Sequence, residues 1–183
     1  LKEASLEINE AIDFLNYYYE QRIVLEDTSE SFKGKGVGLI CSPWNFPLAI
    51  PLGSIFSSLI CGNAVLFKPA PESSLIGWII VSALWEAGVP KELLQFIPCH
   101  EELSGKTLIT HPQLDYVNLT GSDKTASQFL NYKPNLDLIA ETGGKNAIVI
   151  SNICDHEEAI QDIIQSAFSY SGQKCSACSI VLC

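Results

Sequence analysis

The chain has 183 residues, of which 47% are hydrophobic and 17% charged, and its formal net charge is −10. This balance excludes a disordered protein and allows a sizeable core in one domain, or in one domain and part of a second. An acidic chain without a Lys/Arg cluster repels nucleic-acid phosphates, so we expect no nucleic-acid partner. No apolar run reaches the roughly 18–20 residues that span a membrane, so we expect no membrane span.

Helical and strand patterns alternate along the sequence. Leu6, Ile12 and Tyr19 are among the apolar residues at helical spacing that predict a helix over residues 3–27. From residue 37, short apolar runs alternate with segments of roughly 10–15 residues that have helical character. We predict strands at 37–41, 64–67, 94–97, 116–119 and 136–140, and helices at 47–61, 73–87, 101–110 and 122–131. The apolar stretch 76–84 predicts a buried helix, and Ser122 is expected to cap the last helix.

This alternation predicts an α/β fold: a doubly wound, Rossmann-like parallel sheet of about five strands with helices on both faces. A strand at 147–150, a helix at 155–170 with Asp155 as N-cap and an apolar run at 180–183 indicate the start of a second α/β domain. We therefore divide the chain into an N-terminal helix (1–31), a Rossmann-like domain (32–141) and the beginning of a catalytic domain (142–183). Because the sequence stops within an apparent strand, we expect a truncated C-terminus.

Polar residues follow several of the predicted strands, where open parallel sheets bind their ligands. Glu141 directly follows an apolar strand, so partial desolvation would favour a general base, although a simple turn carboxylate is the alternative. Asn45, held between two prolines, suits an oxyanion donor or a structural amide. Lys68 is either a ligand of ribose or phosphate or a solvated lysine. Gly121-Ser122 precedes a helix whose N-terminus suits a pyrophosphate. No Gly-x-Gly-x-x-Gly fingerprint follows any strand.

Cys175 lies in the loop-like stretch Ser-Gly-Gln-Lys-Cys (171–175), beside Lys174, which favours the reactive thiolate. These residues alone leave two interpretations open, a nucleophile and an unreactive thiol. The three histidines occupy predicted loops or helix ends and give little support to a Cys–His pair. Cys178 completes a Cys-x-x-Cys pair, but zinc needs a second pair, so we expect no metal.

Five segments together resemble the aldehyde dehydrogenase superfamily in order and in spacing. They are Pro-Trp-Asn-Phe-Pro (43–47), Phe-Lys-Pro-Ala (67–70), Leu-Thr-Gly-Ser (119–122), Glu-Thr-Gly-Gly-Lys-Asn (141–146) and Gly-Gln-Lys-Cys (172–175). Within that family, segments 42–50, 140–147 and 173–178 resemble the 1-pyrroline-5-carboxylate (glutamate semialdehyde) dehydrogenase branch, which includes the dehydrogenase part of bifunctional proline-catabolic enzymes. Thr142 and Ser176-Ala177 are typical of this branch.

The resemblance implies a role for each matching residue. Cys175 would attack the aldehyde, Asn45 would stabilise the oxyanion and Glu141 would activate water to hydrolyse the thioester. Ser176 is a candidate contact for the substrate's α-carboxylate. NAD would be bound by Ser42, Pro43, Trp44, Lys68, Glu72, Gly121, Ser122, Thr142 and Gly143. Pro71 stands where many members have Glu, and Glu72 is one position later, which leaves NADP as an alternative cofactor.

The resemblance also implies a small aldehyde substrate, a homo-oligomeric full-length protein, and a cytoplasmic location or, in a eukaryote, the mitochondrial matrix. Because the family continues well past the cysteine, we expect these 183 residues alone to be inactive. Three alternatives stay open: another substrate such as succinic semialdehyde, an acylating dehydrogenase that uses coenzyme A, and a nucleotide-binding module without catalysis.

Overall fold

The computed structural model describes residues 2–28, 33–100, 104–151 and 155–183. The chain forms two compact units, residues 1–141 and 142–183, and each is described by itself. The boundary that the sequence suggests between residues 31 and 32 lies outside the described residues.

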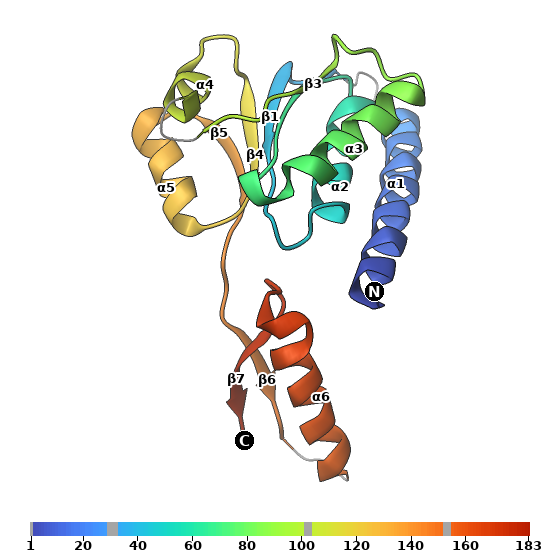
Figure 1. Cartoon of the computed structure of the whole chain (residues 1–183), viewed down its shortest axis with the longest axis vertical. Helices are drawn as coiled ribbons and strands as arrows, with labels where there is room; N and C mark the ends of the chain where they lie inside the picture. The colour runs from blue at the N-terminus through green and yellow to red at the C-terminus, as the bar shows by residue number, and fades with distance from the viewer. Residues whose placement is uncertain (1, 29–32, 101–103, 152–154) are drawn as a thin grey trace. The chain divides into compact units, whose positions relative to one another are not determined.

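Five parallel strands make up the sheet of the first unit, in the order β3-β2-β1-β4-β5 (Figure 1). They are β1 (Val37–Cys41), β2 (Ala64–Lys68), β3 (Leu94–Phe96), β4 (Tyr116–Thr120) and β5 (Asp137–Glu141). The chain winds outward from β1 in one direction to β3 and then returns to β4 on the other side. This order confirms the predicted doubly wound, Rossmann-like sheet.

Helices cover both faces of this sheet. α2 (Ala49–Ile60) and α3 (Ser74–Glu86), which follows the short 3-10 helix η1 (Pro71–Ser73), pack on one face, where Ile40 and Phe67 are buried. α4 (Lys106–Thr110) and α5 (Asp123–Tyr132) pack on the other, over Leu39 and Leu119. The two cores are separate because neighbouring residues of a strand point to opposite faces. Residues 101–103 of the predicted helix 101–110 lie outside the described residues.

α3 corrects the expectation of a buried helix over residues 76–84. Ile80 and Val81 are buried against the sheet, but Trp78 is 48% exposed and Ile79 is 53% exposed. A helix that packs on a sheet through one stripe leaves its opposite side uncovered within the same unit. The apolar run therefore predicts the helix correctly, but it does not show which sides of the helix are buried.

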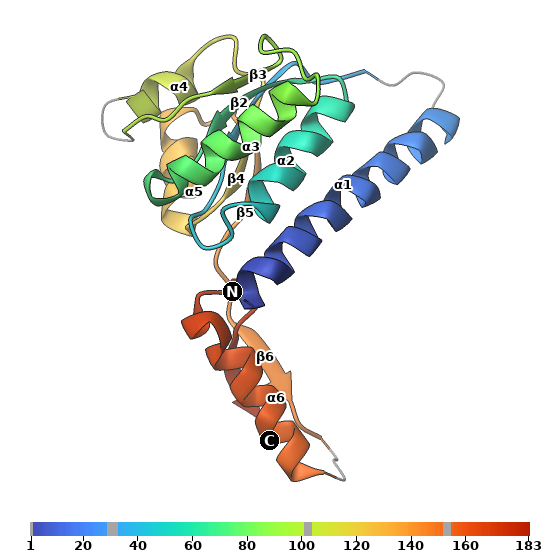
Figure 2. The same cartoon turned by 45° about the vertical axis from the view of Figure 1, so that its right-hand side comes forward.

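The N-terminal helix α1 (Lys2–Thr28) lies alongside α2 (Figure 2). Ala11 is buried in this contact, and a Cβ added to Gly53 of α2 would lie 3.1 Å from the ring of Phe14, so the glycine permits a close approach. Arg22 Nε donates to the carbonyl oxygen of Ile60 at 2.8 Å. The apolar residues that predicted this helix are, by contrast, mostly half-exposed, among them Leu6, Ile12 and Tyr19.

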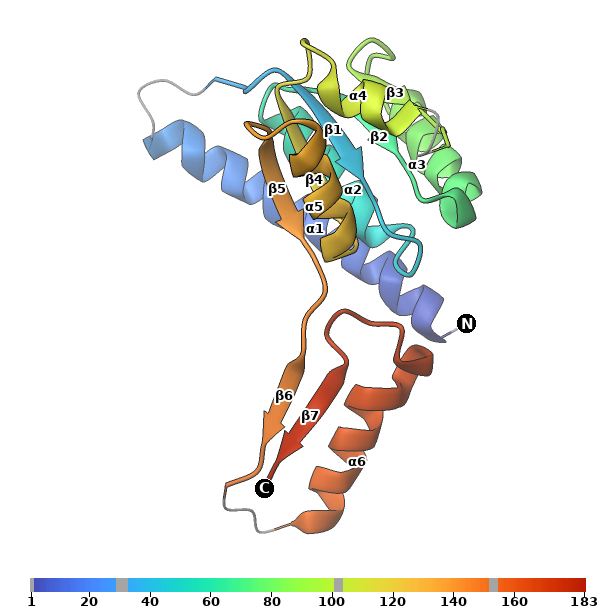
Figure 3. The ribbon, with the colours of Figure 1, turned by 90° about the vertical axis from the view of Figure 1, so that its left-hand side faces the viewer.

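The second unit is a small α/β structure in which two parallel strands lie side by side next to a helix (Figure 3). Its elements are β6 (Asn146–Val149), α6 (His156–Phe168), the 3-10 helix η3 (Ser169–Gly172) and β7 (Cys178–Leu182). Asp155 caps α6 as predicted, because its carboxylate accepts the N–H groups of Glu157 at 2.9 Å and Glu158 at 3.1 Å. Throughout the described ranges, every helix is too short or too polar to cross a membrane.

Candidate functional site

The carboxyl ends of four strands meet at one edge of the sheet. Cys41 of β1 pairs with Lys68 of β2, and Thr120 of β4 pairs with Glu141 of β5. Two backbone hydrogen bonds extend this edge: Ser42 N–H donates to the Lys68 carbonyl oxygen (3.4 Å) and Gly121 N–H to that of Glu141 (3.0 Å). The residues that the sequence places at strand ends in this unit are thus brought to a common edge, next to the reversal of strand order between β1 and β4.

The loop after β1 carries Asn45 and leads into α2. Trp44 is exposed, and Asn45 is half-buried. Leu48, the N-cap residue of α2, has no side-chain acceptor of its own. Glu7 of α1 supplies one, because its Oε1 accepts the N–H groups of Leu48 (2.7 Å) and Ala49 (3.2 Å). Sequence reasoning missed this contact, since no local motif links residues 41 positions apart.

Ser42 Oγ is a buried polar atom without a hydrogen-bond partner among the described residues. A buried hydroxyl without a partner costs about 1–3 kcal/mol. A polar group that arrives at the carboxyl end of β1 would satisfy this hydroxyl. The edge therefore suits a ligand rich in hydroxyl and phosphate oxygens, such as a dinucleotide.

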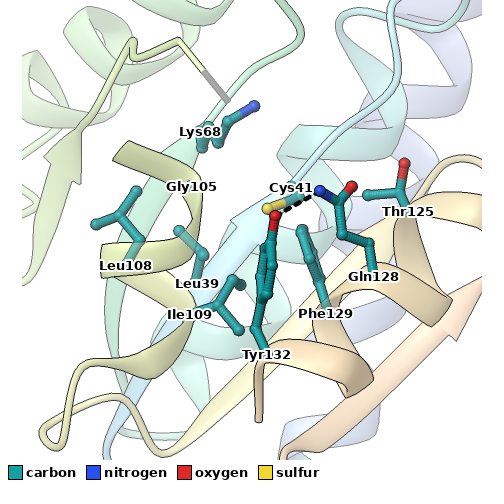
Figure 4. Close-up of a pocket in the computed structure, with 10 residues that line it drawn as sticks. All are labelled: Leu39, Cys41, Lys68, Gly105, Leu108, Ile109, Thr125, Gln128, Phe129 and Tyr132. Atoms are coloured by element: carbon teal, nitrogen blue, oxygen red, sulfur yellow. Dashed lines mark hydrogen bonds between the residues drawn. The ribbon is translucent and has the colours of Figure 1, made fainter. Parts of the chain in front are cut away.

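A small apolar recess, partly open to solvent, lies between the strand ends and the helices α4 and α5 (Figure 4). Lys68 is only 6% exposed, and its side chain lines this recess. Within α5, Gln128 Nε2 donates to the hydroxyl of Tyr132 at 2.5 Å (Figure 4). The other lining residues are Leu39, Cys41, Gly105, Leu108, Ile109, Thr125 and Phe129. Apolar walls with a few polar groups are typical of sites for flat aromatic ligands, and a nucleotide base is one.

Ser122 is the N-cap of α5, as predicted: its Oγ accepts the N–H of Thr125 at 3.1 Å. Thr125 and Lys68 both line the recess, so the first turn of α5 borders the same recess as the lysine. A helix N-terminus carries partial positive charge and unpaired N–H groups. Positive charge therefore comes to this recess from both the lysine and the helix.

Glu141 is the last residue of β5 instead of the residue after it. Within the described part of the chain, β5 is an edge strand that pairs only with β4, and the Glu141 side chain is exposed. The first unit thus does not supply the partial desolvation that we expected for this carboxylate. Glu72, in η1, is exposed as well.

The remaining predicted site residues belong to the second unit. Thr142 and Gly143 begin it, and Cys175 and Ser176 are exposed in a turn closed by Ala177 N–H donating to the Lys174 carbonyl oxygen at 3.1 Å. Three consecutive left-handed residues precede that turn: Tyr170 (φ 54°), Ser171 (φ 57°) and Gly172 (φ 70°). From the opposite strand, the Asn146 amide hydrogen-bonds to this loop. The sequence singled out the cysteine but not its contact with Asn146.

A parallel sheet in this strand order, with helices on both faces and an apolar recess at its carboxyl edge, defines the first unit as a doubly wound, Rossmann-like α/β domain. The chain belongs to the aldehyde dehydrogenase family, whose profile matches residues 1–183. The resemblance carried by the five sequence segments is thereby confirmed.

Similar proteins place the chain in one branch of that family. It is 40% identical over 197 residues to a 1-pyrroline-5-carboxylate dehydrogenase of Geobacillus kaustophilus, an alignment that covers 97% of this chain and 38% of the relative. It superimposes on proline utilization A from Corynebacterium freiburgense with a TM-score of 0.93 and 41% identity, covering 98% of this chain and 19% of that one. A 1-pyrroline-5-carboxylate dehydrogenase from Thermus with bound NAD gives a TM-score of 0.89 and 32% identity, covering 98% of this chain and 39% of that one. The chain thus spans well under half of the length of these relatives.

Proposed function

We propose that the full-length protein, meaning the complete product of the gene, oxidises glutamate semialdehyde, the open form of 1-pyrroline-5-carboxylate, to glutamate with NAD. The observation that carries this proposal is the whole-chain similarity to proteins named 1-pyrroline-5-carboxylate dehydrogenase, together with retention of Cys175, Glu141 and Asn45. Residues 32–141 would form the cofactor domain and residues 142–183 the start of the catalytic domain. A homo-oligomer and a cytoplasmic location stay predictions.

Cys175 is the proposed nucleophile. Its thiolate sulfur forms a bond to the aldehyde carbon while the carbonyl π electrons move to oxygen, which gives a thiohemiacetal oxyanion. The side-chain amide of Asn45 and the backbone N–H of Cys175 donate hydrogen bonds to that oxygen. One such donor is worth about 3 kcal/mol of transition-state stabilisation. Ser176, next to the nucleophile, is proposed to contact the substrate's α-carboxylate.

NAD held by Lys68 and Ser122 would supply the acceptor for the hydride that the carbon attached to sulfur loses. Cys175 then carries the acyl group as a thioester, and Glu141 takes a proton from a water molecule that attacks the acyl carbon. The carbon–sulfur bond breaks, glutamate leaves and the thiolate of Cys175 is restored. Burial of the Glu141 carboxylate would have to come from residues outside the first unit, since in that unit it is exposed.

The recess beside Lys68 is the proposed site for the adenosine part of the cofactor. Lys68 would donate to ribose hydroxyls, and Ser122 with the first turn of α5 would face the pyrophosphate. Ser42 to Trp44, Gly121, Thr142 and Gly143 would complete the contacts. NAD is proposed over NADP because Glu72, displaced by one position from its usual place, still brings negative charge near a 2′-phosphate; the shift keeps NADP as the alternative.

Steady-state NADH formation by the full-length protein tests the proposal. We expect a higher kcat/KM with 1-pyrroline-5-carboxylate than with succinic semialdehyde, and no measurable rate with the former would overturn the substrate. Glu141→Gln should give a burst of about one NADH per active site and then stop, because the thioester accumulates. A Cys175→Ser enzyme that kept full activity would overturn the mechanism.

Two other candidate functions make different predictions in the same assay. An acylating dehydrogenase would need coenzyme A for sustained turnover and would depend little on Glu141. A nucleotide-binding module without catalysis would bind NAD but form no NADH with any aldehyde. The joint presence of Cys175, Glu141 and Asn45 favours the hydrolytic dehydrogenase over both.

A further inference from the structure

Asn146, the first residue of β6, contacts the loop that carries Cys175. Its side-chain nitrogen Nδ2 donates to the carbonyl oxygen of Cys175 at 2.6 Å and to that of Ala177 at 3.2 Å. The strands β6 and β7 are parallel neighbours (Figure 3). Asn146 pairs with Cys178 at the start of the ladder, where the register is irregular. One side chain thus connects strand β6 to both sides of the turn at residues 175–177.

The chemistry of this contact calls for an amide. Both partners are carbonyl oxygens, which only accept hydrogen bonds, so the –NH2 end of Asn146 must face them, and its two hydrogens match the two acceptors. An aspartate of the same shape would direct a charged oxygen at two carbonyl oxygens. An alanine would leave both carbonyls to solvent.

The backbone of the loop has local features of its own. The left-handed conformations of Tyr170 and Ser171 are unfavourable for residues with a Cβ, each by roughly 1–2 kcal/mol. Between that stretch and β7, backbone hydrogen bonds run from Gln173 N–H to the Tyr170 carbonyl oxygen and from Ala177 N–H to that of Lys174, both at 3.1 Å. These bonds are local, whereas the Asn146 amide ties the loop to a strand 29 residues earlier.

We propose that Asn146 is a positioning residue for Cys175: by holding the carbonyl groups of Cys175 and Ala177, it sets the direction of the thiol and of the Cys175 N–H. This role rests on the proposed function of Cys175 as the nucleophile. Asn146 itself need not touch the substrate. Its effect is on the orientation of the attacking sulfur and of the N–H that stabilises the oxyanion, and small errors in such geometry reduce the rate strongly.

Asn146→Asp and Asn146→Ala in the full-length protein test this role, with Gln161→Ala as the control because Gln161 is an exposed amide on α6 of the same unit. We expect kcat for aldehyde oxidation to fall at least ten-fold in both Asn146 variants while KM for NAD stays within about two-fold. Hydrogen–deuterium exchange of residues 174–177 should become at least ten-fold faster, with α6 unchanged. The control should leave all three quantities unchanged.

Each outcome decides between positioning and a general structural role. Faster exchange throughout α6 as well as the loop would show that Asn146 merely stabilises the unit, and would overturn the inference. So would unchanged exchange at 174–177, or an unchanged kcat despite faster loop exchange. If the unmodified enzyme oxidises no aldehyde, the proposed function and with it the positioning role fall, whereas the exchange data still show whether Asn146 holds the loop.

Discussion

The carboxylate of Glu7 on α1 accepts a hydrogen bond from the backbone N–H of Leu48, 41 residues further along the chain. It accepts a second from Ala49, so a side chain from one helix caps the N-terminus of another. The loop that ends at this cap carries Asn45. The N-terminal helix is thereby connected to the proposed oxyanion donor.

Replacement of Glu7 by alanine should lower both stability and activity. Loss of an N-cap costs about 1 kcal/mol, and we expect a lower melting temperature and a several-fold lower kcat. Glu7→Gln keeps an acceptor oxygen and should retain most of the melting temperature and of kcat. Glu10→Ala, at an exposed position of the same helix, should change neither quantity. If Glu7 acts through Asn45, its effect on kcat should largely disappear in an Asn45→Ala background; full additivity would contradict this.

Lys68→Met should weaken cofactor binding without unfolding the protein. Methionine fills a similar volume without a charge in a residue that is almost fully buried. Loss of a charged hydrogen-bond donor is worth about 1.5–3 kcal/mol, so the Kd for NAD in a calorimetric titration should rise roughly ten- to a hundred-fold. Lys91→Met serves as the control, because Lys91 is exposed and precedes β3 at the amino edge of the sheet. Unchanged affinity in Lys68→Met would contradict the proposed adenosine site.

Two substitutions at Ser122 separate helix capping from anion binding. Ser122→Ala removes the acceptor for the N–H of Thr125 and should cost about 1 kcal/mol of stability. Ser122→Asp keeps an acceptor and should leave thermal stability near that of the wild type, yet its negative charge should repel the pyrophosphate and weaken NAD binding. Wild-type NAD affinity in the aspartate variant would place the pyrophosphate elsewhere.

Tyr116 should make the protein sensitive to alkaline pH. Its ring crosses β1 at Gly38, where an added Cβ would meet the ring, and burial raises the pKa of the Tyr116 hydroxyl above its ordinary value near 10. Above about pH 10 the unfolded chain therefore releases this proton more readily than the folded chain, and stability falls as the pH rises. Tyr116→Phe should remove that part of the fall, as measured by urea midpoints between pH 8 and 11. Equal pH dependence in both proteins would contradict the assignment.

The sequence predicted the sheet well, because buried parallel strands are short continuous apolar runs whose spacing reveals the crossover helices. It was less informative about where elements end: the apolar pattern stops at Ala140, but the pairing with Thr120 extends β5 to Glu141. It also predicted α1 from apolar residues that turn out to be half-exposed, while the face with Ala11 packs on α2.

Contacts between distant side chains and backbone had no signal in the sequence. Glu7 and Asn146 are ordinary polar residues, and only the fold brings them to Leu48 and Cys175. The motifs point to residues with a proposed chemical role, because such roles require particular residue types. The residues that hold such groups in place depend on the three-dimensional structure.

The strand order also affects how the protein emerges from the ribosome. β1 lies at the centre of the sheet, and its second neighbour is β4: Gly38 pairs with Tyr116 only after β2, β3 and the α-helices α2, α3 and α4 have been made. At a synthesis rate of about 5–20 residues per second, the edge of β1 that pairs with β4 remains unpaired for roughly 4–16 s. An unpaired, apolar strand edge is prone to join other chains. The nascent protein is therefore expected to be most vulnerable to aggregation, and most dependent on chaperones, before residue 120 is exposed.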